Sequence, residues 1–276
     1  ELLAAVLNNQ PKSLSEAVHA KLLEELRLYS IIGGLPECVK TRFEGGSLLD
    51  VRSIQNDLIV AFEQDFSKYP KQMDAAILRD VWRNTYVSVG RQISYASLSR
   101  EHTGVTNKKA IDLLEKARLV KLSRAVASAS LPFDFNTTLR IKPFAGDIGL
   151  YQAMLGRPAD EVLREKDLLN TYNGALAEQF VAQELMSLLG GSEPHWWKRD
   201  TKNAQAEVDF IVSLEGRVQP IEVKSGAAGR LKSLHQLLKE SPSVNDAIVL
   251  SSAQFGQMPE QRLRFIPIYF AGAIGN

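Results

Sequence analysis

The chain has 276 residues, of which 45% are hydrophobic and 24% charged, a balance typical of globular proteins. At about 100–200 residues per domain, this length predicts two or three domains. The formal net charge of +1 offers no overall electrostatic argument for binding nucleic acid. The single cysteine, Cys38, excludes a disulfide framework and a cysteine-rich zinc site, and we expect it to be a small buried side chain in a reducing compartment.

The N-terminal third is predicted to be helical. Apolar residues at helical spacing predict a first helix over residues 1–30, and Gly33-Gly34-Leu35-Pro36 should end it. Two further helices are expected over 50–68 and 72–89. The chain begins without a methionine or a signal-peptide pattern, so we expect residues 1–70 to be a helical segment that follows an absent upstream part. No apolar run approaches the ~20 residues of a membrane span, and we expect a cytoplasmic protein without membrane contact.

Residues 91–124 differ from the rest of the chain in their charge. They carry eight basic and three acidic residues, a local net charge of +5. The pattern predicts a helix, a turn at 103–105, a helix capped by Thr106, and then two strands, as in a helix-turn-helix with a β-hairpin wing. We therefore predict a winged-helix-like domain over 71–150. Arg100, Lys108 and Lys109 are its candidate contacts to DNA phosphates, although packing against protein is an equal alternative.

From residue 171 onward the pattern changes to that of an α/β domain. After a junction of short helical pieces over 143–170, we expect a domain over 165–276 with one helix, three strands, a second helix and two strands. The expected elements are 171–190, 195–199, 206–214, 217–225, 230–240, 246–252 and 263–270.

Two of these strands carry acids and an amine on one face. Alternation places Glu207, Asp209 and Ile211 together on the first strand, and Glu222 and Lys224 together on the second. Neighbouring carboxylates repel unless a cation lies between them, and oxygen ligands favour Mg²⁺ or Mn²⁺. Such an ion can hold a phosphate and activate water, while Lys224 would position the nucleophile or stabilise the transition state.

A further acid comes from the helix that precedes these strands. Glu178 shares a stripe with Val181, Ala182, Leu185 and Leu189, and a carboxylate on an apolar stripe is costly unless it is paired or bound. We expect Glu178 either to reach the metal, directly or through water, or to be an acid at the edge of the helix face.

These residues carry a resemblance to a known superfamily. The helical Glu178, Asp209 and the Glu222-x-Lys224 pair, in the element order αβββαβ, resemble the PD-(D/E)XK, or restriction-endonuclease-like, superfamily. The resemblance implies an α/β restriction-endonuclease-like fold, with metal ligation by Asp209, Glu222 and Glu178. It also implies that Lys224 is the catalytic lysine and a contact to nucleic acid. Val208 stands where the nominal proline of the motif would be.

Longer segments resemble a particular group of proteins. NGALAEQFVAQELMSLLG, WWKRD, AEVDFIV, IEVKSG, IVLSS and GGLPECV are similar to bacterial and archaeal AAA+-type ATPases that carry domain of unknown function 4143. Those ATPases have a G-x-x-x-x-G-K-[ST] phosphate loop, which this chain lacks. ATP hydrolysis is therefore assigned to the absent upstream part.

Three functions remain open from the sequence. The first is a Mg²⁺-dependent DNA phosphodiesterase. The second is an inactive module of the same fold that binds nucleic acid or a partner protein and regulates an ATPase, and the third is a structural adaptor; an oligomer is compatible with each. For Asp209, Glu222 and Lys224 the plain alternative is a solvated strand face with a surface ion pair. At least one of Trp196 and Trp197 is expected in the core rather than stacked on bases, and His235 is expected on an exposed helix face.

Overall fold

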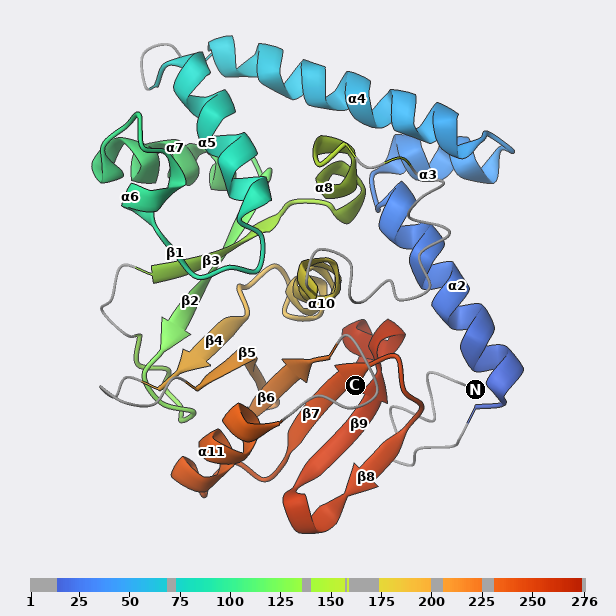
Figure 1. Cartoon of the computed structure of the whole chain (residues 1–276), viewed down its shortest axis with the longest axis vertical. Helices are drawn as coiled ribbons and strands as arrows, with labels where there is room; N and C mark the ends of the chain where they lie inside the picture. Colours follow the sequence, from blue (N-terminus) through green and yellow to red (C-terminus); the bar gives the residue numbers. More distant parts are fainter. Residues whose placement is uncertain are drawn as a thin grey trace. The chain divides into compact units, whose positions relative to one another are not determined.

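The structure is a computed structural model that describes residues 14–68, 73–135, 140–156, 158, 174–199, 206–224 and 231–274 (Figure 1). The described residues form two compact units. The first, called the sheet unit here, draws on residues 1–24, 123–138 and 167–276, and the second, the helical unit, on 25–122 and 139–166. The units thus alternate along the chain. The predicted domains 1–70, 71–150 and 165–276 are consecutive and stay a prediction.

The helical unit begins within α2 (Glu16–Ile32), whose residues up to Glu24 belong to the sheet unit. It continues with α3 (Pro36–Phe43), α4 (Leu48–Asp65) and a short 3-10 helix η1 (Phe66–Lys68). The predicted break at Gly33-Gly34-Leu35-Pro36 is confirmed, with Pro36 opening α3. Cys38 is fully buried, as expected, and it packs with Ile32 and Val51. The first part of the helix predicted over residues 1–30 lies outside the described residues.

Among the described residues, the second half of this unit contains seven further elements, of which β2 continues from Ser123 into the sheet unit; the winged-helix-like arrangement stays a prediction. They are α5 (Ala75–Val87), β1 (Ile93–Ser94), α6 (Tyr95–Leu98), α7 (Gly104–Lys116), β2 (Val120–Val126), β3 (Arg140–Ala145) and α8 (Ile148–Met154). Strands β1 and β3 pair antiparallel. The predicted cap was wrong: α7 begins at Gly104, and the hydroxyl of Thr103 accepts the N–H of Thr106. Both threonines fit the capping rule, and the one that ends the extended backbone takes the role.

The sheet unit contains the predicted α/β elements in the predicted order. They are α10 (Ala175–Leu188), β4 (His195–Lys198), β5 (Glu207–Leu214), β6 (Arg217–Val223), α11 (Lys232–Glu240), β7 (Ala247–Ser251) and β9 (Leu263–Pro267). Three short elements were not predicted, namely β8 (Gly256–Met258), η3 (Pro259–Gln261) and η4 (Ile268–Ala273). The mixed α/β class is thus found, while a restriction-endonuclease core stays a prediction.

The sheet of this unit is mixed, with both parallel and antiparallel pairs. The end of β2 pairs parallel with β4, β4–β5–β6 is an antiparallel meander, and β6, β7 and β9 are parallel neighbours. Strand β8 returns antiparallel to β9, at the outer edge in Figure 1. Helix α11 is the crossover between β6 and β7, as parallel pairing requires.

One apolar cluster holds α11 against the sheet. Leu234 and Leu237 of α11 pack with Val208 and Ile211 of β5 and with Val249 of β7. Trp196 and Trp197 are both buried, so the expectation of at least one core tryptophan is confirmed, and His235 is exposed as expected. None of the helices within the described part of the chain has both the length and the apolar composition of a bilayer span.

Candidate functional site

A β-bulge lies next to Asp209. Trp197 pairs with Val208 and His195 pairs with Ile211, so two steps along β4 correspond to three steps along β5. The extra residue breaks the strict alternation that the sequence predicted, because Val208 and Ile211, three apart, join the same core cluster. Bulges redirect side chains and are frequent next to active sites. The extra residue of the bulge therefore changes the course of the backbone next to Asp209.

The carboxylate of Asp209 reaches across to the neighbouring strand. The last pair of the β5–β6 ladder is Phe210 with Ile221, so Asp209 and Glu222 both lie one residue beyond it. Oδ2 of Asp209 accepts the backbone N–H of Val223 at 2.8 Å. The side chain thus continues the pairing where the backbone ladder stops. This confirms that Asp209 lies beside the Glu222–Lys224 segment.

Glu222 and Lys224 form an ion pair at the end of β6. Nζ of Lys224 lies 2.6 Å from Oε1 of Glu222, and the two side chains are 22% and 8% exposed. The backbone of Lys224 remains fixed, since its N–H donates to the carbonyl oxygen of Leu250 in β7 at 2.8 Å. Such a buried carboxylate is unlike the solvated surface pair that was the plain alternative, because only the lysine end reaches solvent.

Register also fixes the face of the sheet on which Glu222 lies. Glu222 pairs with Val249 in the parallel β6–β7 ladder, and side chains in register point to the same face. Val249 packs against α11 through the cluster it shares with Leu234 and Leu237. Glu222 therefore lies at the end of the strand on the face that α11 covers.

Glu178 comes from a separate element, the first turn of α10, and is half-buried. The stripe predicted for it is confirmed, since Val181, Ala182 and Leu185 are fully buried. Among the described residues, Glu178, Asp209 and Glu222 do not form a group whose ligand atoms all lie within 4.8 Å of one another. The role of Glu178 as a metal ligand stays a prediction.

The carboxylate oxygens of Asp209 and Glu222 are ligands of the type that a hard divalent ion prefers. Asp209 commits Oδ2 to a backbone N–H, which orients the carboxylate in the way that ligating carboxylates are usually held. Both residues supply oxygen, the ligand type that Mg²⁺ prefers. A bound ion there would supply Lewis-acid polarisation of a phosphate. Without an ion, Lys224 already compensates the charge of Glu222.

The predicted phosphate contacts lie on and beside α7. Lys108 and Lys109 are exposed on this helix, and Arg100 is exposed before it. Lys108 forms an ion pair with Asp112 at 3.6 Å, in which both side chains are about half exposed. The opposite face of α7 is buried through Ala110, Ile111 and Leu114. The helix is thus amphipathic, with its basic residues directed to solvent.

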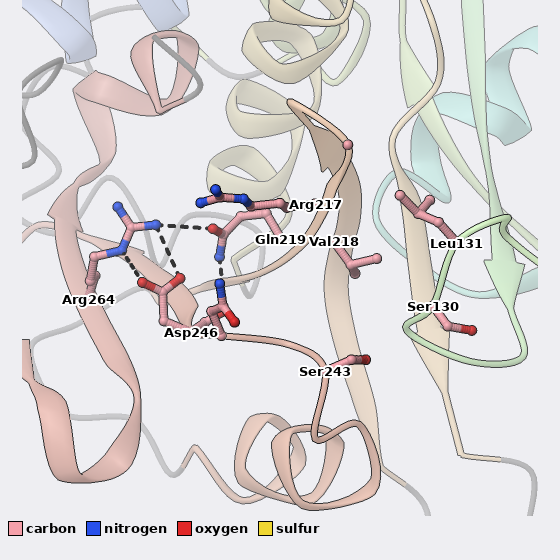
Figure 2. A pocket seen from close by; sticks show the side chains of 10 residues that line it. Ser130, Leu131, Arg217, Val218, Gln219, Ser243, Asp246 and Arg264 are labelled. Atoms are coloured by element: carbon pink, nitrogen blue, oxygen red, sulfur yellow. Dashed lines mark hydrogen bonds and ion pairs between the residues drawn. The ribbon is translucent and has the colours of Figure 1, made fainter.

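A hollow of about 410 Å³ lies near the start of β6, at the opposite end of the strand from Glu222 (Figure 2). Within it, Arg264 Nε lies 2.7 Å from Asp246 Oδ2, and Arg264 Nη2 donates to Gln219 Oε1 at 3.0 Å. Gln219 Nε2 in turn donates to the carbonyl oxygen of Asp246 at 3.2 Å. The guanidinium is engaged by these partners, so the hollow does not present it as an anion receptor. The better candidate site is at the other end of the strand.

The fold and site define a mixed α/β protein with two acids and a lysine gathered at the ends of adjacent strands, together with a helical unit. The chain belongs to the family described as Domain of unknown function (DUF8612), whose profile matches residues 23–161. The profile described as Domain of unknown function (DUF4143) matches residues 173–270. The expected resemblance to proteins with domain of unknown function 4143 is therefore confirmed, whereas the ATPase context stays a prediction.

Comparison with individual proteins gives a distant similarity. No curated protein matches it. Among solved structures, it is similar to Can2 from Sulfobacillus thermosulfidooxidans in complex with cyclic tetra-adenylate (cA4), with 14% sequence identity and a TM-score of 0.26. The similarity covers 79% of this chain and 52% of the Can2 chain, so this chain spans about half of that protein. At this TM-score the likeness does not establish a shared fold.

Proposed function

We propose that the sheet unit is a divalent-metal-dependent phosphodiesterase that acts on DNA. The observation that carries the proposal is the meeting of Asp209 with the end of β6, where Glu222 and Lys224 form a partly buried ion pair. Two carboxylates and one ammonium are gathered at the ends of two adjacent strands. Removing such charges from water costs free energy, so stability alone does not explain the arrangement. The three groups match what phosphodiester hydrolysis requires, namely carboxylates for a cation and an amine for developing negative charge.

Each residue has a distinct role in this proposal. Asp209 and Glu222 would hold Mg²⁺ or Mn²⁺, with Glu178 as an additional acid from α10. The ion would polarise the scissile phosphate. Lys224 would orient the attacking water and offset charge on the transition state. Since Lys224 pairs with Glu222 at 2.6 Å, a metal that takes up Glu222 would release the ammonium toward the substrate.

The substrate would be bound in part through α7 of the helical unit. Its exposed Lys108 and Lys109, with Arg100 nearby, provide the positive charge that the near-neutral chain lacks as a whole. Such residues contact phosphates and carry no sequence preference by themselves. Val105, 68% exposed at the start of α7, is an apolar group of the kind that touches base edges when a helix enters the major groove.

Cleavage assays test the proposal. The full chain would be incubated with Mg²⁺ or Mn²⁺ and with linear duplex, circular duplex or single-stranded DNA. We expect metal-dependent cleavage that is lost in Asp209→Ala and in Glu222→Gln. Glu215→Gln is the matched control, because this exposed acid lies at the turn of the same β5–β6 hairpin. Cleavage that persists in chelator, or in both site variants, would refute the proposal.

A second candidate function is a non-catalytic module that binds nucleic acid or a partner protein and regulates an associated ATPase. The favouring observation is that the acids have compensating partners without an ion, since Val223 donates to Asp209 and Lys224 pairs with Glu222. Under this alternative, no DNA form is cleaved with any divalent ion, while DNA or protein binding is retained in Asp209→Ala.

A further inference from the structure

A second group of potential metal ligands lies in the helical unit. Asp80 of α5 and Glu101 and His102, between α6 and α7, each offer one ligand atom, and all three atoms lie within 4.8 Å of one another. Sequence spacing does not indicate this group, because Asp80 lies about twenty positions before the other two and His102 has no partner at ligand spacing. The group forms only when the fold brings α5 against the turn.

The separation of two of these atoms fits a tetrahedral ion. Nε2 of His102 lies 3.6 Å from Oδ2 of Asp80. Ligands bound at about 2.0–2.2 Å in tetrahedral zinc sites are about 3.3–3.5 Å apart. Small side-chain adjustments would therefore complete the coordination, with the exposed Glu101 closing from the solvent side.

The surroundings hold these ligands in place. Asn84 Nδ2 donates to Oδ1 of Asp80 at 3.1 Å, which leaves Oδ2 directed at His102. Hydrogen bonds of this kind fix the orientation of ligating carboxylates. The turn is fixed as well, because buried Asn107 donates to the carbonyl oxygen of Ser99 at 3.1 Å and Glu101 N–H donates to the Ser99 hydroxyl at 3.3 Å. The Asp80 carboxylate and the backbone of the turn that carries Glu101 and His102 are thus held by hydrogen bonds.

One candidate ligand atom lacks a hydrogen-bond donor in the described part of the chain, and a bound cation would take the place of that donor. The Asp80 side chain is 37% exposed, but its Oδ2 atom is itself shielded from solvent, and among the residues that the structure describes no hydrogen-bond donor contacts it. The imidazole nitrogen at 3.6 Å is too distant for a hydrogen bond. A carboxylate oxygen that is shielded from water and lacks a donor is unfavourable, and more so when it is charged. A metal ion at this point would remove that cost.

We propose that Asp80, Glu101 and His102 bind a divalent transition-metal ion, zinc being the best match. The imidazole nitrogen excludes a preference for Mg²⁺ or Ca²⁺, which take oxygen ligands, and suits Zn²⁺. Three protein ligands leave a fourth position for water. The ion would join α5 to the turn that precedes α7, and so would stabilise the helix that carries Lys108 and Lys109. This inference is independent of the function proposed for the sheet unit.

Calorimetric titration with ZnCl₂ tests the proposal on the full chain. The protein would carry Asp209→Ala throughout, so that the other candidate site does not contribute. We expect one zinc ion per chain, with affinity reduced at least tenfold by His102→Ala and likewise by Asp80→Asn. Asp112→Asn is the matched control, because Asp112 is a partly exposed acid on α7 outside the group, and we expect unchanged binding.

A thermal-unfolding series keeps the test decisive if one variant folds poorly. Zinc should raise the Tm of the Asp209→Ala protein, chelator should reverse the rise, and the rise should be absent in the Asp80→Asn variant, which preserves size and the acceptor for Asn84. No zinc binding in the titration would overturn the proposal. Binding that survives both His102→Ala and Asp80→Asn would overturn it as well, because the ion would then lie elsewhere.

Discussion

The ammonium nitrogen of Lys224 lies 2.6 Å from a carboxylate oxygen of Glu222, whose side chain is only 8% exposed. The two ends of this pair differ in their access to water, because the Lys224 side chain is 22% exposed. Removing the Lys224 side chain should therefore destabilise the protein more than removing the charge of Glu222. The lysine can turn to solvent when its partner is removed, whereas the glutamate cannot.

We expect Lys224→Met to lower the free energy of unfolding by about 1.5–3 kcal/mol, since a buried carboxylate loses its cation. Glu222→Gln should cost less, and Glu222→Gln in the Lys224→Met background should recover part of the stability. Urea unfolding of the four proteins measures the coupling. Equal costs for the two single substitutions would show that the pair is effectively solvated.

The turn between α2 and α3 gives a second prediction. Gly33 has φ of 75°, and a Cβ atom there would lie 2.3 Å from Oδ1 of Asp147. Gly33→Ala should therefore cost both the left-handed backbone, about 1–2 kcal/mol, and the clash. Gly45→Ala is the matched control, because Gly45 has φ of 92° with nothing within 4 Å of an added Cβ. In thermal unfolding, the Tm of Gly33→Ala should be lower than the Tm of Gly45→Ala. The reverse order would contradict the close approach of Gly33 to Asp147.

The same aspartate predicts a dependence of stability on pH. Burial raises the pKa of Asp147, although N–H groups of Gly34, Leu150 and Gly149 act in the opposite direction. The folded state therefore holds the proton more tightly than the unfolded state. The stability that Asp147 contributes is fully present below its ordinary pKa of about 4 and is lost as pH rises through the higher folded pKa.

Comparison with Asp147→Asn isolates this effect, because asparagine does not titrate. The difference in unfolding free energy, wild type minus variant, should shrink as pH rises from 4 to 7 in urea titrations. A difference that grows over this range would mean that the backbone N–H donors outweigh burial and hold the pKa low.

DNA binding through α7 is predicted to be salt-dependent. Replacing both Lys108 and Lys109 by alanine should weaken duplex binding and reduce the slope of log K against log [salt] by about 2, because each lysine that binds a phosphate adds about one unit to the slope. Lys40→Ala is the control, since Lys40 of α3 forms a similar exposed i,i+4 pair with Glu44, the residue that follows the helix. Fluorescence anisotropy at several salt concentrations gives both slopes. An unchanged slope in the double variant would remove α7 from the interface.

Much of the element order in the described residues was predictable from local patterns. Apolar periodicity found α4, α5 and α7, and alternation of apolar and polar residues found β5 and β6 within one or two residues of their ends. The three residues of β8 were missed because so short a strand has no periodicity to detect. The prediction that Asp209 lies beside the segment of Glu222 and Lys224 required only that β5 and β6 pair as a hairpin.

Contacts between distant residues were not predictable. The bulge at Asp209 depends on pairing with β4, and alternation along β5 gives no warning of it. The ring of His19 contacts the Tyr269 hydroxyl at 2.6 Å and the Ser252 carbonyl oxygen at 2.8 Å, across more than 230 positions of sequence. The group of Asp80, Glu101 and His102 depends in the same way on packing between α5 and the turn before α7. Such features arise from tertiary packing, which sequence patterns do not encode locally.

Asp209 and Glu222 are proposed to hold one divalent ion between them, and the catalytic function depends on that ion. Anomalous diffraction from crystals soaked in Mn²⁺ locates it directly, and it also separates this site from the one at Asp80 and His102. We predict an anomalous peak within coordination distance of both Asp209 and Glu222, and its disappearance in Asp209→Ala crystals. A map without a peak at these two carboxylates, at a Mn²⁺ concentration that supports activity, would contradict the account.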